Sequence, residues 1–368
     1  FSHYIYQPKP YSMKIKVIFL IIILLPIFSK TKAQTPAKLV EVTTRFINTL
    51  SVAEQKSAIY SFEDKKRVLW TNLPVGQMPR PGIRYGDLSD SSRLVFHRVL
   101  TEILSSQGYL KTTSIMQLDD ILNVLYQKAF DDGQIKKELL TMTQNLKWDH
   151  GNYYISFFGM PTLDGNWSIS LGGHHIALTM TTNGKKISVS PYFIGTDPAE
   201  VKSGKYAGLR VLSKEEDYGF LLIHSLTDKQ KAKAILSRSI PKDIITNPKS
   251  SQRIDTYDGI STEEFSEVQK AYLSFIIQEY VHNFEHEKAH EILDKMKKSG
   301  FKNMYFAWIG SLENNKPHYY MIHSPEFLIE YDNVGFQNDG NHIHAIFRET
   351  GNDFGEDILK QHYIESHK

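Results

Sequence analysis

Two kinds of hydrophobic spacing divide the chain into helical stretches and two groups of strands. Apolar residues recur at spacings of three and four from 34 to about 150, and again in 214–226, 228–237, 263–280 and 282–298, which predicts helices. Apolar and polar residues alternate with a period of two within about 152–194 and 304–348, which predicts strands. Strands that fall in two groups, separated by helices, favour an α+β fold. We expect an antiparallel or mixed sheet packed with helical layers.

The first strand group contains the dipeptide Asn183-Gly184, which is typical of a two-residue hairpin turn. It predicts a hairpin of strands 167–182 and 185–194. Pairing outward from the turn sets Met180 opposite Ile187 and Leu178 opposite Val189. In this arrangement His174 lies on the apolar face, and His175 shares a polar face with Thr179, Ser188 and Ser190.

The strand predicted for 341–348 has an apolar face, formed by Ile343, Ala345 and Phe347, and a polar face. The polar face carries His342, His344 and Arg348. Residues two apart on a strand have Cα atoms about 6 to 7 Å apart and project side by side. Such a histidine pair suits chelation of one divalent metal ion, since neutral imidazole is a common metal ligand.

We expect the two strand groups to join in one sheet, because small isolated sheets are only marginally stable. Joining would bring the Gly-Gly-His-His segment close to His342 and His344. Carboxylates on a neighbouring predicted strand would then complete the shell of the ion. The expected metal ligands are His174 or His175, together with His342, His344, Glu330 and Asp332. The sequence does not choose among zinc, iron, manganese and copper, and it indicates no organic cofactor.

Three further residues are candidates for binding or catalysis. Arg348 or Arg210 is expected to bind an anionic group of the substrate. Asp353 lies in Asn352-Asp353-Phe354-Gly355, whose first interpretation is the start of a terminal helix with an N-cap.

A second metal motif competes with the strand histidines. His286-Glu287-Lys288-Ala289-His290 spells H-E-x-x-H, in which helical spacing puts both imidazoles on one zinc ion. Charged residues surround the motif, so a solvated amphipathic helix is the favoured interpretation. The pair His342 and His344 followed by Glu349 also resembles half of the cupin metal motif. Strand parity, however, puts Glu349 on the opposite face.

Composition narrows the chemistry. The chain has no cysteine, so histidine, carboxylate and hydroxyl groups must carry any reaction. With 43 basic and 41 acidic residues the net charge is only +2, and nothing favours nucleic acid as a partner. A small-molecule or extracellular substrate is expected, and the oligomeric state is left open.

The N-terminal stretch predicts export. Lys14 and Lys16 precede an apolar run over 17–28, and small residues at 31–33 offer a cleavage site before Gln34. The run of about 12 residues is shorter than the roughly 20 needed to span a bilayer, so we expect no stable membrane insertion after cleavage. Residues before Met13 are interpreted as upstream sequence, 13–33 as a signal peptide, and 34–368 as a single domain in the periplasm or outside the cell.

Short motifs across the predicted mature chain resemble a known family. They are Gly173-His174-His175, Pro191-Tyr192-Phe193-Ile194-Gly195 with Pro198, Ala207-Gly208-Leu209-Arg210, Phe306-Ala307-Trp308-Ile309-Gly310, Ile329-Glu330-Tyr331-Asp332-Asn333, Asn341-His342-Ile343-His344 with Arg348, and Asn352-Asp353-Phe354-Gly355-Glu356-Asp357 with His362-Tyr363. In this order they resemble domain of unknown function family 3500. The resemblance implies a secreted or periplasmic bacterial protein with fungal relatives, and it implies no particular activity. The H-E-x-x-H segment lies outside these motifs.

The leading hypothesis is therefore an exported metal-dependent enzyme, either a hydrolase or an oxidoreductase. The first alternative is an exported binding protein in which the same polar face captures a ligand without turnover. A zinc protease built on His286 and His290 is the third.

Overall fold

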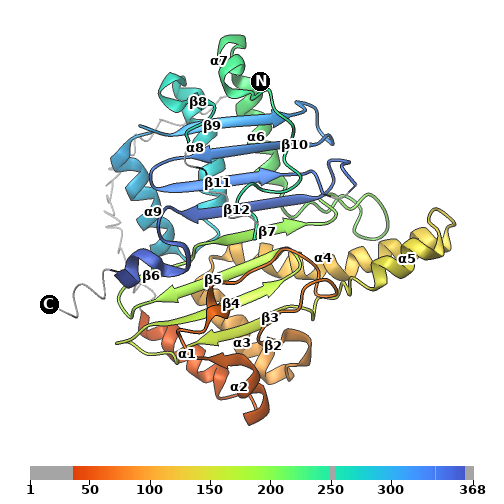
Figure 1. Cartoon of the computed structure of the whole chain (residues 1–368), viewed down its shortest axis with the longest axis vertical. Coiled ribbons are helices and arrows are strands. Elements are labelled where there is room, and N and C mark those ends of the chain that lie inside the picture. The colour runs from red at the N-terminus through yellow and green to blue at the C-terminus, as the bar shows by residue number, and fades with distance from the viewer. Residues whose placement is uncertain (1–35, 249–253, 255, 336, 361–368) are drawn as a thin grey trace, which may run out of the picture. The chain divides into compact units, whose positions relative to one another are not determined.

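A twelve-stranded sheet is the framework of this computed structural model, which describes residues 36–248, 254, 256–335 and 337–360 (Figure 1). The expected signal peptide and His362-Tyr363 lie outside the described residues. The strands run in the order β1-β3-β4-β5-β7-β12-β11-β10-β9-β8, with β2 on β3 and β6 on β5. All pairs are antiparallel except β1 with β3. The predicted α+β class is confirmed.

The predicted strand groups correspond to two halves of this sheet. The first half contains β3 (Tyr154–Phe158), β4 (Trp167–Gly173), β5 (Ile176–Thr182), β6 (Ile187–Ser188) and β7 (Tyr192–Thr196). The second half contains β9 (Tyr305–Gly310), β10 (His318–His323), β11 (Phe327–Asp332) and β12 (Ile343–Glu349). The short strands β1 (Ile59–Tyr60), β2 (Ile83–Arg84) and β8 (Ile260–Ser261) lie toward the edges and were not predicted.

The two halves join where β12 pairs with β7, and β7 in turn pairs with β5. In the register, Ile176 faces Ile194 across β5 and β7, and Ile343 faces Thr196 across β7 and β12. The start of β5, the end of β7 and the start of β12 therefore meet at one end of three neighbouring strands. The functional candidates gather at this end.

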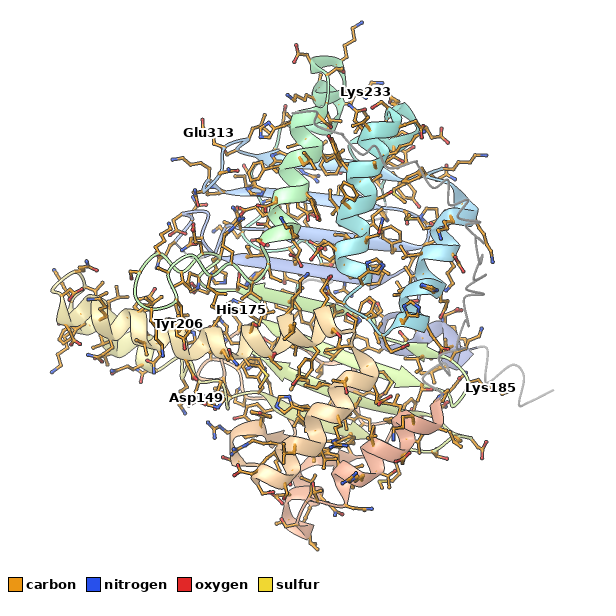
Figure 2. The ribbon with its side chains drawn as sticks, turned by 180° about the vertical axis from the view of Figure 1, so that it is seen from behind. Asp149, His175, Lys185, Tyr206, Lys233 and Glu313 are labelled. Carbon is orange, nitrogen blue, oxygen red and sulfur yellow. The ribbon has the colours of Figure 1, made fainter. Side chains whose placement is uncertain are left out.

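Helices cover one face of the sheet, as Figure 2 shows from behind. They are α1 (Pro36–Ile47), α2 (Val52–Ala58), α3 (Asp90–Ile103), α4 (Ser106–Asp131), α5 (Lys137–Gln144), α6 (Ser213–Ser225), α7 (Asp228–Ala234), α8 (Glu267–Val281) and α9 (His286–Ser299). The main hydrophobic core lies on this face, and it includes Ile343, Ala345 and Phe347 of β12. The predicted faces of this strand are confirmed. Among the described residues, no helix is both long and apolar enough to cross a membrane.

Loops rather than helices pack on the other face. Ile346 and Phe193 form a small cluster there with Ile244 and Trp70. A second cluster joins β9 and β10 to the partly buried Leu236, Ile240, Ile245 and Ile254. The segments before β2 and after α7 therefore cover the face of β12 that carries His344 and Ile346.

The predicted hairpin at Asn183-Gly184 is wrong in register and in extent. The stretch 167–182 is not one strand, because it reverses at His174-His175, where Gly173 pairs with Ile176. His175 adopts a positive φ of 65°, which allows this tight turn. At the next turn Thr182 pairs with Ile187, leaving a four-residue loop whose backbone N–H groups at Lys185 and Lys186 bond the Asn183 side chain. His175 consequently leaves the polar face predicted for it.

A buried histidine makes the stability of the fold depend on pH. His318 is completely buried against Trp308, with ring centroids 4.6 Å apart, and burial lowers its pKa to about 4. Its Nδ1–H donates to the Lys316 carbonyl, while Nε2 has no hydrogen-bond partner among the residues that the structure describes. In the unfolded chain the same ring takes up a proton near pH 6.5.

We predict that this difference destabilises the fold as the pH falls from 6.5 toward 4, because only the unfolded state then binds the proton. Between pH 7.5 and pH 5 the loss is about 2 kcal/mol from this residue. His318→Phe should reduce the pH dependence of the free energy of unfolding, measured by urea titration, by that amount. His224→Phe, which replaces an exposed ring, should leave it unchanged. Equal pH dependence in wild type and His318→Phe would contradict the assignment.

Candidate metal centre

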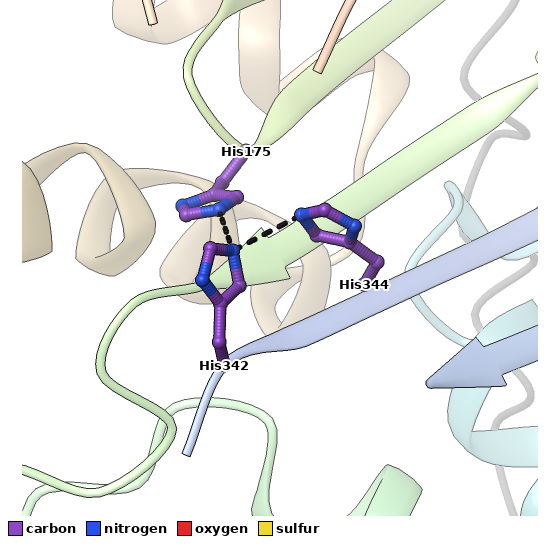
Figure 3. A group of neighbouring side chains, drawn as sticks. All are labelled: His175, His342 and His344. Atoms are coloured by element: carbon purple, nitrogen blue, oxygen red, sulfur yellow. Dashed lines mark hydrogen bonds between the residues drawn. The ribbon is translucent and has the colours of Figure 1, made fainter. Parts of the chain in front are cut away.

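Three histidines converge at the shared end of β5, β7 and β12 (Figure 3). His342 precedes β12 and His344 lies within it, while His175 comes from the turn between β4 and β5. The Nε2 atom of His342 lies 2.8 Å from Nε2 of His175 and 3.1 Å from Nε2 of His344. One ring nitrogen from each residue lies within 4.8 Å of the others, close enough to hold one metal ion. We call these three residues the histidine trio.

The spacing of the trio is near that of a metal centre. Ligand nitrogens on a tetrahedral ion, with bonds of about 2.0 to 2.1 Å, lie roughly 3.3 to 3.4 Å apart. Separations of 2.8 and 3.1 Å require the rings to open by only a few tenths of an ångström.

Gly195 makes room for the trio. It faces His344 across β7 and β12, and its N–H donates to the His175 carbonyl at 2.8 Å. A Cβ here would lie 2.6 Å from the Ile343 carbonyl oxygen, 2.8 Å from the His175 ring and 3.1 Å from the His344 ring. Any larger residue would therefore push the rings apart.

Carboxylates orient two of the rings from behind. Nδ1 of His344 lies 2.8 Å from Asp243 Oδ1, and Nδ1 of His342 lies 3.4 Å from Asp197 Oδ2. Carboxylates on the far nitrogen of a metal-bound imidazole fix its tautomer and raise its basicity. Both partners come from outside the strands, Asp197 following β7 directly and Asp243 belonging to the loop after α7.

The loop that carries Asp243 is fastened to the sheet by two residues that the sequence analysis assigned to the site itself. Buried Glu330 accepts hydrogen bonds from the backbone N–H groups of Ile245, at 2.6 Å, and Thr246, at 3.1 Å. Arg348 donates to the Thr246 hydroxyl at 3.0 Å and to its carbonyl at 2.7 Å. Glu330 and Arg348 therefore support the centre without joining the trio.

His174 lies beside the trio but belongs to another cluster. Its Nδ1 lies 2.7 Å from Oδ1 of Asp119, a buried residue of α4, and Tyr153 donates to the second oxygen at 3.0 Å. The ring stacks 3.6 Å from that of His175, between centroids. Of the two neighbouring histidines, the structure therefore brings His175 into the trio and anchors His174 to the helical layer.

Arg80 ties the proline-rich segment at 73–82 to the same turn. One terminal nitrogen of its guanidinium donates to the carbonyls of Thr71, at 3.2 Å, Gly173, at 2.9 Å, and Leu73. Burial lowers its pKa to about 10, so the side chain stays a cation at neutral pH. The segment therefore packs beside the histidine turn and contributes Leu73, Pro74 and Gln77 to the cavity lining described below.

Burial controls protonation at the trio. It lowers the pKa of His175 and of His342 well below the usual value, and the neighbouring histidines lower both further. Burial also disfavours the charged form of His344, but the hydrogen bond that this ring donates to Asp243, together with the charge of nearby carboxylates, outweighs burial and raises the pKa of His344. Burial raises the pKa of Asp197 to about 7. Two of the three rings are therefore neutral at neutral pH, the form that binds metal.

The trio lies in the wall of a cavity of about 860 Å³. Its apolar lining consists of Leu73, Pro74, Met142, Leu146, Trp148, Ile240 and Val334. Its polar lining consists of Asn72, Gln77, Thr143, His174, Asp197, Lys242, Asp243 and Asn338. Apolar atoms nevertheless form most of the cavity surface, and a largely apolar cavity with converging polar groups is the usual form of a small-molecule site.

The other predicted site residues do not belong to the histidine trio. Asp332 is buried opposite His344, close to it and to Asp243, and these three form a second possible ligand group. Asp353 accepts hydrogen bonds from Ser190, at 2.6 Å, and from Arg348. Arg210 pairs with Glu216, at 2.7 Å, and Asp217, at 2.9 Å. Neither Arg210 nor Arg348 nor Asp353 lines the cavity of the trio.

The H-E-x-x-H helix lacks the setting of a metal site. His286 and His290 stack on the exposed face of α9, with ring centroids 4.0 Å apart. Lys288, within the motif, points inward and binds Glu349 at 2.9 Å. Glu349 is therefore on the helical face of the sheet, as strand parity predicted. No group of three possible ligands among the described residues includes these histidines.

Sequence reasoning missed Asp243, Asp197, Asp119 and Gly195 as functional residues. Asp243 lies in a loop without periodicity, and Asp119 lies in a helix as one acid among many. Gly195 and Asp197 had a signal, since they fall in or next to a motif that carries the family resemblance.

Comparison with known proteins gives a family and nothing more specific. The model of a family described as Protein of unknown function (DUF3500) matches residues 32–356. No curated protein and no solved structure matches.

We predict that Gly195→Ala lowers the affinity of the trio for zinc by about tenfold or more, because the new methyl group separates the rings. Gly172→Ala is the matched control, since its Cβ would meet only Arg80 side-chain atoms at 3.7 and 3.9 Å. Zinc affinity is measured by calorimetry and the fold by circular dichroism. A folded Gly195→Ala variant that binds zinc as tightly as wild type would show that ring convergence does not matter.

Proposed function

The chain belongs to the DUF3500 family, and we propose that it is a metal-dependent hydrolase whose ion is bound by Nε2 of His175, His342 and His344. A mostly apolar small molecule would bind in the adjoining cavity. This proposal deepens the expectation of a metal site, and it chooses among the reaction types that the sequence left open.

The observation that carries the proposal is the close approach of ring nitrogens that cannot all be donors. In its neutral form His344 donates from Nδ1 to Asp243, so its Nε2 presents a lone pair. That lone pair lies 3.1 Å from Nε2 of His342, whose own Nδ1 lies 3.4 Å from Asp197. Nε2 of His342 thus approaches two other ring nitrogens but can carry only one proton, so protonation of this atom supplies one well-directed N–H···N hydrogen bond for two contacts. A divalent ion satisfies all three rings at once.

The side chains that would bind the metal favour hydrolysis over oxygen chemistry. Three neutral imidazoles and one open position are a known catalytic arrangement for zinc, and a bound zinc ion lowers the pKa of its water to about 7. Iron oxygenases instead use two histidines and one carboxylate as direct ligands. Here Asp197 and Asp243 lie at the Nδ1 side of the imidazoles, away from the shared point.

The remaining residues of the site would hold the metal-binding histidines in place and would take no part in the reaction themselves. Asp243 and Asp197 hold the rings, and Glu330 and Arg348 hold the loop of Asp243. The cavity leaves the open side of the centre accessible to a substrate, while its apolar walls exclude bulk water and strengthen electrostatic interactions inside.

A binding protein without turnover is the alternative, because the same cavity can capture a ligand. Turnover of esters or amides by the metal-loaded protein, lost on chelation, supports the enzyme; stoichiometric ligand binding without any turnover supports the binding protein. Export through a signal peptide at 13–33 is part of the same proposal.

We predict that His342→Ala with His344→Ala abolishes stoichiometric zinc binding, because two of three ligands are lost. The fold should persist, since these side chains lie outside the main core. His286→Ala with His290→Ala is the matched control and should keep full zinc content. Zinc is measured by elemental analysis after dialysis, with circular dichroism for folding. Loss of zinc in the second variant alone would move the site to the H-E-x-x-H helix.

A further inference from the structure

We propose that the cavity beside the histidine trio selects an apolar monoanion, in particular a carboxylate, and that Lys242 provides the selection. This inference rests on the proposed function, because it counts the charge of the bound ion.

Lys242 has a distinctive place in the cavity lining. Among the described residues that line the cavity, it is the one with a lysine or arginine side chain. Lys242 is an exposed residue and forms no ion pair within the described part of the chain. It is also the neighbour in sequence of Asp243, whose carboxylate is engaged by His344 and by Asn72, at 3.0 Å. Lys242 is therefore available to a ligand.

The charges around the cavity favour an anion. A divalent ion and Lys242 contribute three positive charges, whereas Asp197 and Asp243 contribute at most two negative ones. Among the residues that line the cavity the sum is positive whichever form Asp197 takes; buried Asp332, beside Asp243, lies outside this lining. A bound monoanion would bring the net charge of the cavity close to zero. A bound cation would instead be repelled by the metal ion and Lys242, in a site partly shielded from water.

The apolar lining of the cavity determines what the uncharged part of the ligand must be. Trp148 and Val334 are buried, and Leu73, Leu146 and Ile240 complete an apolar surface. Gln77 and Asn338 are exposed amides that carry no charge. A ligand gains binding free energy here by burying apolar surface, at about 25 cal/mol for each square ångström. It therefore needs an apolar body. An aromatic or aliphatic carboxylate combines the two requirements.

The test uses two probes of nearly equal shape and opposite charge, 2-naphthoate and 2-naphthylmethylammonium. Calorimetry on the zinc-loaded full chain should show at least a tenfold preference for naphthoate. Lys242→Glu should reduce this preference by about tenfold, because it reverses the charge beside the ligand. Lys242→Arg should keep it. Lys229→Glu on α7 is the control, since this exposed lysine lies outside the cavity lining, and it should also keep the preference.

Zinc content, measured on the same samples, separates a failure of the charge selection from a failure of the metal centre. Full zinc content with equal affinity for both probes, or an unchanged preference in Lys242→Glu, would overturn this inference and leave the metal centre standing. Wild-type protein that binds no zinc would overturn both. Full zinc content, with a preference lost only in Lys242→Glu, supports the inference.

Discussion

The closeness of three imidazole nitrogens is the constraint on which the rest of the site depends. Without a cation it is only partly satisfied, because burial keeps the rings of His175 and His342 neutral and the single Nε2 position of His342 can carry no more than one proton for two ring contacts. The molecule nevertheless holds the rings there with a positive-φ turn at His175 and a missing side chain at Gly195. Local features that are costly alone are typical of functional sites. A cation at the shared point removes the cost.

The sheet supplies the framework of the candidate site, and segments outside its strands supply the carboxylates behind the rings. Three neighbouring strands end together, which brings histidines more than 160 positions apart into contact, as the 2.8 Å between His175 and His342 shows. The loop face of the sheet then adds Asp243, held in place by Glu330 and Arg348. This division is common, since binding residues often lie on loops positioned by a rigid scaffold.

The elements with strong periodicity were predictable, and the long-range geometry was not. Alternation in 341–348 identified both faces of β12 and the pairing of His342 with His344. The turn at His174-His175 was missed because neither residue is a usual turn former, and Asn183-Gly184 offered a stronger local signal. Glu330 and Arg348 were chosen for their charge, and only tertiary contacts show that they fasten a loop. Asp243 had no local signal at all.

The most direct test of the account is X-ray absorption spectroscopy of the zinc-loaded protein at the zinc edge. If the histidine trio binds zinc, the spectrum should show three imidazole nitrogens at about 2.0 to 2.1 Å from the zinc ion and one further light atom in the open position. The variant with His342 and His344 both replaced by alanine should retain no zinc after dialysis and should therefore give no zinc-edge signal. A wild-type spectrum dominated by carboxylate oxygen, with no imidazole scattering, would contradict the proposed metal centre.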